Sequence, residues 1–277
     1  MRRAGRQGIP ASAAARSCAI TLAGLLLTAC ASGPMRDGPP RDRRDVASIP
    51  DAVPRIEPRS RYGNPSSYVV DGRRYYVMDS ARGYAERGIA SWYGRKFHGR
   101  RTSSGEIYDM YGMSAAHRRL PLPTYVRVSN LRNGRQVVVR VNDRGPFKDN
   151  RLIDLSYAAA AKLAITEAGT GLVEVQALDA AAPRMRTAAR TQPVNLDSRE
   201  PRLYLQVGAF VSEHNARQLL GRLQDADLGQ VRIEQTHRHQ RAVYRVRVGP
   251  LASVEAADDL ADRLAVLGIE QMHVVVD

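Results

Sequence analysis

The stretch that decides the fold is residues 137–147, Val-Val-Val-Arg-Val-Asn-Asp-Arg-Gly-Pro-Phe. Its first five residues are typical of a buried strand, and this strand runs directly into a polar turn. An aspartate in Asn-Asp-Arg-Gly is most often a turn former that hydrogen-bonds to its own backbone. From this stretch alone, a turn is therefore a better interpretation of Asp143 than a catalytic acid.

Short strands are also predicted on both sides of this stretch. Residues 126–128 and 173–175 alternate apolar and polar side chains, as half-buried strands do. Residues 155–163, which include four consecutive alanines, predict the one clear helix of the region. Short strands with one or two helices suit a small closed barrel, so we expect a β-barrel domain over residues 83–180.

The C-terminal part, residues 203–277, has a different order of elements. Its pattern predicts a strand, a helix, two strands, a helix and a strand, at residues 203–207, 213–223, 231–234, 244–248, 254–267 and 273–276. This βαββαβ order indicates a small antiparallel sheet with both helices on one face. The other face of the sheet is then free to bind a ligand.

Two breaker-rich stretches flank the predicted barrel. Residues 31–66 are rich in Pro, Arg, Asp, Gly and Ser, and such a composition buries too little apolar surface to offset the chain entropy. We therefore predict a disordered or extended tether over residues 30–82, with a short hairpin at residues 68–77 around Asp71-Gly72. Residues 181–202 are predicted to form a second linker.

The N-terminus looks like the signal peptide of a lipoprotein. Four arginines precede an apolar run that is too short to cross a bilayer but suits a secretory signal. The run ends in Leu27-Thr28-Ala29-Cys30, so residues 1–29 are expected to be removed and Cys30 to carry lipid. Cys18 and Cys30 are the only cysteines, which leaves no disulfide and no thiolate metal site in the mature chain.

The protein is basic, with 42 Lys and Arg, 28 Asp and Glu, and a net charge of +14. Nucleic acid, acidic lipid and acidic polymers are therefore all conceivable partners. Residues 84–180 carry 15 basic and 9 acidic residues, whereas residues 203–277 carry 8 and 10. The acidic C-terminal domain, the export signal and the lack of an aromatic-rich RNA-binding strand signature argue against nucleic acid.

Four motifs, in order, resemble the rare lipoprotein A family. They are Gly88-Ile89-Ala90-Ser91-Trp92-Tyr93-Gly94, Phe97-His98-Gly99-Arg100-Arg101-Thr102-Ser103-Ser104-Gly105-Glu106, Ala115-Ala116-His117-Arg118-Arg119-Leu120-Pro121 and Asn142-Asp143-Arg144-Gly145-Pro146-Phe147. Asp154-Leu155-Ser156 extends the resemblance, which covers residues 83–178. One departure is Ser103, where alanine is more usual. The resemblance implies a six-stranded double-psi β-barrel and a lytic transglycosylase that needs no cofactor or metal.

Residues 203–277 resemble the sporulation-related repeat (SPOR) domain, through residues 206–210 and 244–250. The overall expectation is a mainly β barrel followed by a small α+β domain. Together the two resemblances imply an enzyme that acts on peptidoglycan glycan strands without stem peptides, recruited by SPOR to the division septum. Gln206, Phe210 and Tyr244 are candidates for the glycan face, and strand alternation places Gln206 on the same side as Tyr204.

Glu106, His117 and Asp143 are the expected catalytic cluster. Cleavage of a glycosidic bond needs a proton for the leaving oxygen and stabilisation of an oxocarbenium-like centre, commonly from two carboxyl groups in unlike environments. By resemblance Asp143 is the general acid, which requires a raised pKa. Glu106 and His117 would orient substrate, serve the muramyl C6 hydroxyl or shuttle a proton, and these roles are interchangeable at this point. We expect Arg144 to point away from Asp143 or to bind substrate.

Further residues are candidates for substrate binding. Trp92 and Tyr93 either stack on sugars or pack in the barrel. Arg118 and Arg144 belong to a basic group that either forms a solvated surface or binds the lactyl carboxylate of stripped glycan. The other members of this group are Lys96, Arg100, Arg101 and Arg119.

The expected location is the periplasmic face of the outer membrane. Ala31 follows Cys30, and by resemblance to sorted lipoproteins this implies transfer to the outer membrane of a two-membrane cell. Membrane lipid, through Cys30, and stripped glycan are the expected partners, and division proteins are further candidates. The alternative is a non-catalytic lipoprotein that binds glycan and links the membrane to the wall.

Overall fold

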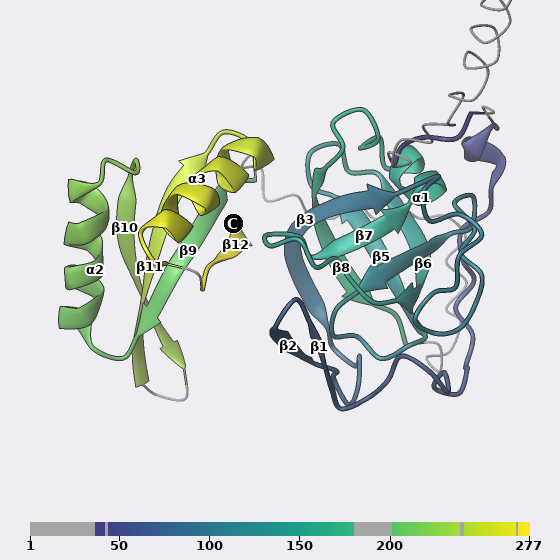
Figure 1. Ribbon diagram of the computed structural model, residues 1–277, viewed down its shortest axis with the longest axis horizontal. Helices are drawn as coiled ribbons and strands as arrows, with labels where there is room; N and C mark the ends of the chain where they lie inside the picture. Colours follow the sequence, from purple (N-terminus) through teal and green to yellow (C-terminus); the bar gives the residue numbers. More distant parts are fainter. Residues whose placement is uncertain (1–36, 42–43, 180–200, 239–240, 270) are drawn as a thin grey trace, which may run out of the picture. The chain divides into compact units, whose positions relative to one another are not determined.

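The computed structural model describes residues 37–41, 44–179, 201–238, 241–269 and 271–277. The predicted signal peptide, Cys30 and nearly all of the linker at residues 181–202 lie outside these residues. The described chain forms a barrel with a segment before it, and a C-terminal domain of two helices and four strands (Figure 1).

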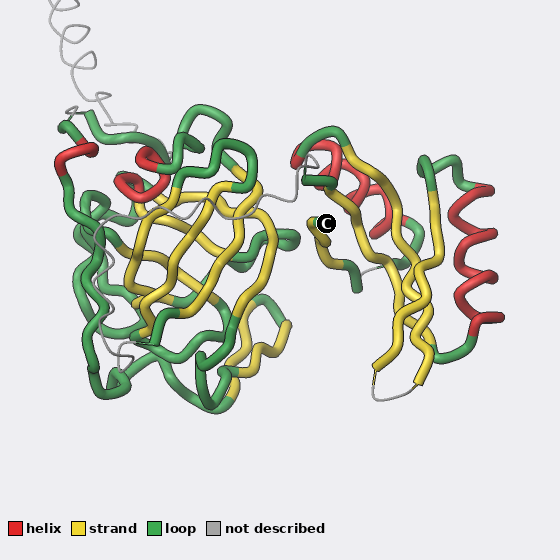
Figure 2. Tube along the Cα trace, turned by 180° about the vertical axis from the view of Figure 1, so that it is seen from behind, coloured by secondary structure: helices red, strands yellow, loops and turns green. Residues whose placement is uncertain are grey.

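Six strands close the barrel in the order β3-β7-β4-β6-β5-β8 (Figures 1 and 2). They are β3 (Ala85–Tyr93), β4 (Ser114–His117), β5 (Thr124–Asn130), β6 (Gln136–Asp143), β7 (Ile153–Ser156) and β8 (Gly171–Ala177). The pairs β3 with β7 and β4 with β6 run parallel, and the other neighbouring pairs run antiparallel. The six-stranded barrel predicted from the sequence is confirmed.

Strand β6 shows how the sequence pattern builds the barrel. Val137, Val139 and Val141 are at most 1% exposed and belong to the barrel core, whereas Arg140 between them is only half-buried. This is the alternation expected when one face of a strand points to the core and the other points outward. The outward face of β6 therefore carries Arg140, and a β-bulge at Asn142 turns Asp143 outward as well.

Helix α1 (Tyr157–Lys162) is shorter than the helix predicted over residues 155–163. Leu155 and Ser156 instead end strand β7, which pairs with β3 and β4. The Ser156 hydroxyl accepts a hydrogen bond from the Ala159 amide at 3.3 Å, so Ser156 is the N-cap and the helix begins after it. The predicted start was wrong because a buried leucine fits both a strand and a helix.

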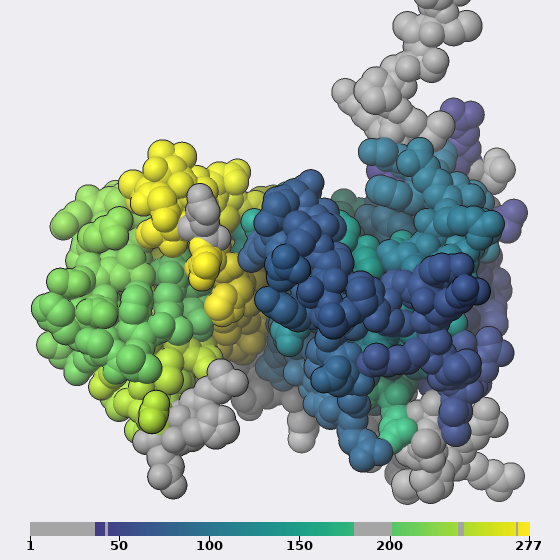
Figure 3. Space-filling model, turned by 60° about the horizontal axis from the view of Figure 1, so that its bottom comes forward, coloured from purple at the N-terminus to yellow at the C-terminus, as the bar shows by residue number. Residues whose placement is uncertain are grey.

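The structure also differs from the predicted disordered tether over residues 44–82, which we call the pre-barrel segment. Its short helix η1 (Val46–Ser48) and the following residues pack on the barrel, and the Asp51 carboxylate accepts the Val138 amide at 2.9 Å. The Ser60 amide donates to the Leu122 carbonyl at 2.8 Å. In Figure 3 the purple and dark-blue atoms of this segment cover part of the barrel surface. Hydrogen bonds to the barrel order a segment whose composition alone predicts disorder.

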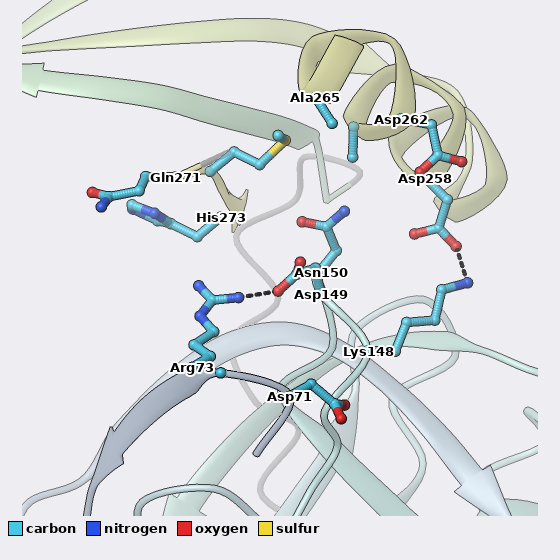
Figure 4. A pocket seen from close by; sticks show the side chains of 13 residues that line it. Asp71, Arg73, Lys148, Asp149, Asn150, Asp258, Asp262, Ala265, Gln271 and His273 are labelled. Atoms are coloured by element: carbon cyan, nitrogen blue, oxygen red, sulfur yellow. Dashed lines mark hydrogen bonds and ion pairs between the residues drawn. The ribbon is translucent and has the colours of Figure 1, made fainter. Parts of the chain in front are cut away.

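The end of the pre-barrel segment forms a hairpin. Strands β1 (Ser67–Val70) and β2 (Arg73–Tyr76) pair antiparallel around Asp71-Gly72, both of which have positive φ, as a tight hairpin turn requires. The Tyr68 hydroxyl donates to the Arg118 carbonyl at 2.8 Å. Arg73 forms an ion pair with Asp149 in the loop after β6 (Figure 4). The hairpin is therefore fastened to the barrel at two points.

The C-terminal domain has a four-stranded antiparallel sheet in the order β10-β11-β9-β12. Its elements are β9 (Leu203–Phe210), α2 (Glu213–Asp225), β10 (Val231–Arg238), β11 (Arg241–Leu251), α3 (Val254–Val266) and β12 (His273–Val276). Leu223 of α2 and Leu264 of α3 pack in one cluster with Leu205 and Val246 of the sheet. Both helices thus cover the same face, and the predicted βαββαβ order is confirmed.

None of the described helices is long and apolar enough to cross a membrane.

Candidate active site

Strand register places four side chains in one line across the barrel. Ala116 of β4 pairs with Asp154 of β7 and with Asp143 of β6, and Asp154 pairs in turn with Ser91 of β3. Paired residues of adjacent strands project to the same face. Since Ile153, beside Asp154, is fully buried in the barrel core, this face is the outer one. We call these four residues the carboxyl row.

The two carboxyl groups of this row have a small side chain between them. Adjacent strands lie about 4.8 Å apart, so two strand spacings, on the order of 10 Å, separate the backbones of Asp143 and Asp154. Only the methyl group of Ala116 stands between them. Ala116 itself packs in a cluster with Tyr93, Tyr108 and other residues. The row thus offers two carboxyl groups over an apolar floor.

Asp143 is held rigidly at the end of β6. Its Oδ1 accepts three hydrogen bonds, from the Ser103 amide at 2.8 Å, the Ser103 hydroxyl at 2.6 Å and the Arg144 amide at 2.7 Å. In the described part of the chain no donor reaches Oδ2. The carboxylate is therefore oriented through one oxygen and can meet a ligand through the other.

Glu106 is brought to the same strand end by the turn at residues 102–106. The Thr102 amide donates to the Glu106 carbonyl at 2.8 Å, and Gly105 in this turn has a φ of +93°, which favours glycine. The Glu106 carboxylate accepts Arg140 Nη1 on both oxygens at 2.8 Å and Asn142 Nδ2 at 2.8 Å. Its side chain is 42% exposed. Glu106 and Asp143 thus lie at the same end of β6.

His117 is not joined to that site. Its ring is buried, Nδ1 accepts the amides of Arg119 (3.1 Å) and Leu120 (2.9 Å), and Nε2 lies 2.9 Å from the Tyr84 hydroxyl. Because Nδ1 accepts two N–H groups, the neutral ring carries its proton on Nε2 and donates it to Tyr84. Tyr84 donates to Glu86 at 3.1 Å. His117 therefore fixes the backbone after β4 rather than contacting either expected catalytic carboxylate.

The pKa of His117 has a consequence for stability. Burial, reinforced by the charges of nearby arginines, lowers this pKa from 6.5 to about 3. A depressed histidine pKa means that the unfolded chain binds a proton that the folded chain refuses, so stability falls as pH drops below about 6.5. Between pH 7 and pH 5 the loss amounts to about 2 kcal/mol.

We expect His117→Gln to remove this pH dependence. Trp92 is the only tryptophan and lies in β3, so urea unfolding followed by its fluorescence reports on the barrel. The free-energy difference between wild type and variant should be smaller at pH 5 than at pH 7, by about 2 kcal/mol. An equal difference at both pH values would contradict the buried neutral ring.

Asp154 is the functional candidate that the sequence reasoning missed. It is half-buried, the Ser91 hydroxyl donates to its Oδ1, and burial raises the pKa of its carboxyl group. The negative charge of Asp143 raises this pKa further, while Ser91 and nearby arginines lower it. A polar residue between the core residues Ile153 and Leu155 is the pattern that could have revealed it. The sequence predicts a helix from residue 155, directly after Asp154, and this hides the alternation of β7.

Trp92 and Tyr93 are both engaged in packing. Alternation along β3 turns Trp92 to the barrel core, where its ring meets the edge of Tyr157 at 5.7 Å between centroids. Tyr93 faces outward, is 7% exposed and stacks on Tyr108 at 4.1 Å. The Tyr93 hydroxyl is buried, without a hydrogen-bond partner among the described residues. Tyr93 therefore lines the floor of the site and offers no free ring face for a sugar.

The Arg144 side chain points away from the Asp143 carboxylate. Its Nε donates to the Gly63 carbonyl at 2.8 Å, Nη1 to carbonyls of the loop after β4, and Nη2 to Asn64 Oδ1 at 3.1 Å. Arg118 donates to the Arg151 carbonyl. Both guanidinium groups thus fasten the chain around the site, and in this structure Arg144 has most of its donors occupied.

In the C-terminal domain the three candidate glycan contacts do not share a face. Gln206 pairs with Arg247 and reaches His273 at 2.9 Å, on the side away from the helices. Phe210 and Tyr244 pack against the apolar cluster beneath the helices. The register shifts between Gln206 and Gly208, where a β-bulge adds one residue to β9. Strict alternation fails at this bulge, which turns Phe210 to the helix side. Tyr244 lies on that side because it shares a face of β11 with the core residue Val246, so the expected placement of both residues with Gln206 was wrong.

The described residues contain no group of three or more His, Cys, Asp or Glu side chains that could hold a metal ion.

The barrel and the C-terminal sheet match known families separately. Residues 85–176 match the lytic transglycolase family (DPBB_1), and residues 200–274 match the SPOR domain. The fold and the site therefore define a class of protein, a double-psi β-barrel of the lytic transglycosylase type followed by a SPOR domain.

Curated relatives narrow this class. Over 327 aligned positions the chain is 38% identical to the endolytic peptidoglycan transglycosylase RlpA of Pseudomonas aeruginosa, covering 93% of this chain and 95% of that protein. The protein of the same name from Vibrio cholerae is 49% identical over 159 positions, with 56% and 60% covered. The solved SPOR domain of Pseudomonas aeruginosa RlpA is 34% identical, covers 26% of this chain and 96% of that domain, and has a TM-score of 0.26. This chain belongs to the RlpA family.

Proposed function

We propose that this protein cleaves peptidoglycan glycan strands as an endolytic lytic transglycosylase, through carboxyl groups on the outer face of its barrel. The observation that carries the proposal is the carboxyl row, in which Asp143 and Asp154 flank the small side chain of Ala116. Relatives that share nearly the whole length of the chain are named for this activity.

The chemistry assigns a different task to each carboxyl group. An acid protonates the oxygen that leaves C1 of N-acetylmuramic acid, while the C6 hydroxyl of the same sugar attacks C1 and gives up its proton to a base. The new C1–O6 bond is the 1,6-anhydro ring, and the broken bond leaves a hydroxyl on the next sugar. Acid and base then recover their starting states by exchanging protons with solvent.

Asp154 is the general acid in this proposal. The acid has to keep its proton near neutral pH, and burial raises the pKa of Asp154. The sequence-based expectation gave this task to Asp143. Asp143, oriented through Oδ1 with Oδ2 left for the ligand, suits the C6 hydroxyl proton and the developing positive charge at C1. Glu106 is more exposed, and its ion pair with Arg140 suits it to bind and orient the sugar.

Stripped glycan is the substrate that we infer. The SPOR match and the basic barrel sequence support this choice. Gln206 stays the candidate glycan contact, on the side of the sheet away from the helices, although its side chain is only 4% exposed in this structure. The lactyl carboxylate of stripped glycan would meet exposed basic residues such as Arg100 and Arg101. The test is the ratio of cleavage rates on stripped and peptide-bearing glycan. If the double variant Arg100→Gln/Arg101→Gln keeps the wild-type ratio, these arginines do not bind the lactyl carboxylate.

We further infer a lipid anchor on Cys30, an outer-membrane location facing the periplasm, and enrichment at the division septum with division proteins as partners. The lipobox-like residues 27–30 and Ala31 support the anchor. Labelled palmitate should enter the wild-type chain and not Cys30→Ala, and the variant should leave the membrane fraction. Palmitate in the variant would overturn the anchor.

Digestion of peptide-free glycan separates the enzyme from a glycan-binding protein. The soluble chain without residues 1–30 is incubated with the strands, and the products are analysed by mass spectrometry. We expect 1,6-anhydro ends. Reducing ends would indicate hydrolysis, and glycan that is bound but intact would leave the non-catalytic alternative.

A further inference from the structure

Arg140, on the outward face of β6, lies between two carboxylates from distant parts of the chain. Its Nη1 donates to Glu106, whereas its Nε and Nη2 donate to Glu57 Oε1 (3.1 Å) and Oε2 (2.8 Å). The contact with Glu57 is a two-pronged fork, the geometry that fixes a guanidinium in both position and plane. Glu106, in contrast, receives only one nitrogen of Arg140. Glu57 therefore orients Arg140, and Arg140 in turn meets Glu106.

Glu57 is firmly held. Arg55 Nε donates to its Oε1 at 3.1 Å, and the Tyr125 hydroxyl donates to the same oxygen. Its side chain is 19% exposed, against 42% for Glu106. The hydrogen bond from Arg140 is the largest influence on the pKa of Glu57, and despite the opposing effect of burial this pKa falls to about 2. Glu57 therefore stays ionised at every pH at which the enzyme would work.

The segment that carries Glu57 is itself attached to β6. The Ala52 amide donates to the Val138 carbonyl at 3.0 Å, and the Val138 amide donates to Asp51. Val138 is two residues before Arg140, so these contacts fix the register between the pre-barrel segment and the strand that leads to Asp143. Glu57 is thus held by the contacts of its own side chain and by the attachment of Asp51 and Ala52 to β6.

We propose that Glu57 is a positioning residue of the active site, which acts through Arg140 to orient Glu106, and that the pre-barrel segment is a working part of the catalytic domain. This inference rests on the role proposed above for Glu106. The charges of Glu57 and Glu106 are balanced by those of Arg140 and Arg55, so Glu57 acts by fixing the geometry of the site and not by adding net charge to it.

Loss of the Glu57 charge releases the fork of Arg140. Arg140 can then turn to Glu106 and move that carboxylate from its place. Displacement of a positioned group by about 1 Å can cost up to about 10²-fold in rate. We expect Glu57→Gln to lower kcat about tenfold and to change KM for glycan by less than about twofold.

The test compares Glu57→Gln with Asp51→Asn in the full soluble chain. Asp51 lies in the same segment and also contacts β6, through Val138, and its other partner is Lys162. Asparagine at position 51 keeps an oxygen that can accept the Val138 amide and loses the ion pair with Lys162, so Asp51→Asn should lower thermal stability and leave kcat unchanged. Arg140→Gln and the double variant Glu57→Gln/Arg140→Gln complete a cycle. Since Glu57 acts through Arg140, the double variant should have the same kcat as Arg140→Gln.

Each outcome is decisive when Glu106→Gln is measured alongside. A fall in kcat for Glu57→Gln but not for Asp51→Asn supports the inference. Wild-type kcat in Glu57→Gln, an equal fall in both segment variants, or additive losses in the cycle would overturn it. If Glu106→Gln is impaired while Glu57→Gln is not, the role inferred for Glu57 is wrong and the role proposed for Glu106 stands. If Glu106→Gln cleaves at the wild-type rate, the role proposed for Glu106 is wrong, and the inference about Glu57 is overturned with it.

Discussion

Replacing Asp154 by Asn is expected to lower the rate of glycan cleavage by about 10²- to 10⁴-fold, the range that positioned proton transfer contributes. An amide cannot protonate the leaving oxygen, but it has nearly the same shape and its carbonyl oxygen can still accept the Ser91 hydroxyl. The barrel should therefore stay folded, with unchanged glycan binding in a sedimentation assay. Cleavage by Asp154→Asn within about threefold of wild type would assign the acid elsewhere.

The pH dependence gives an independent check on Asp154. A general acid works in its protonated form, so the wild-type rate should fall as pH rises through the raised pKa of Asp154. The hydrogen bond from Ser91 lowers this pKa. We therefore expect Ser91→Ala to move the alkaline limb of the pH–rate profile to higher pH. A limb that stays in place, or moves to lower pH, would show that another group titrates there.

Asp143→Asn is expected to reduce cleavage as severely, by about 10²- to 10⁴-fold. The amide loses the negative charge that would serve the C6 hydroxyl and the oxocarbenium-like centre. Its nitrogen also cannot accept the hydrogen bonds from Ser103 and Arg144 if it takes the place of Oδ1. The measurement is the initial rate of formation of anhydro ends at saturating glycan.

Ser103→Ala is the matched control for Asp143. It removes the hydroxyl that donates to Asp143 Oδ1 at 2.6 Å and keeps the amide that donates at 2.8 Å. Loss of one hydrogen bond to a charged group is worth about 1.5–3 kcal/mol, so the rate should fall by roughly tenfold to a hundredfold. A loss as large as that of Asp143→Asn would mean that the hydroxyl itself takes part in the reaction.

Much of this site could be predicted from local sequence. The run of valines at residues 137–141 defines β6, and the polar residues after it define the strand end where Asp143 lies. The glycine-containing turn at residues 102–106 closes on itself and carries Glu106 to the same place. These patterns place Asp143 and Glu106, because each sits in, or next to, the element that the pattern describes. The assignment of both residues to a catalytic site came from the resemblance to the rare lipoprotein A family.

What failed depended on contacts between distant residues. The ring of His117 bonds to Tyr84, 33 residues earlier in the chain, and no spacing rule gives such a partner. The β-bulge in β9 turns Phe210 to the helix side of the sheet. The pre-barrel segment is ordered by apolar contacts with the barrel core, such as those of Val46 and Ile49, and by ion pairs such as Glu57 with Arg140. Composition does not show which distant residues a segment contacts.

The most direct test of the carboxyl row is the mass of the ends that are produced from peptide-free glycan by wild type, Asp143→Asn and Asp154→Asn, with binding measured in parallel. The structure predicts 1,6-anhydro ends from wild type, and from both variants about 1% of that amount or less at unchanged binding. Anhydro ends from either variant at the wild-type rate, or none from wild type, would contradict the assignment of catalysis to this face of the barrel.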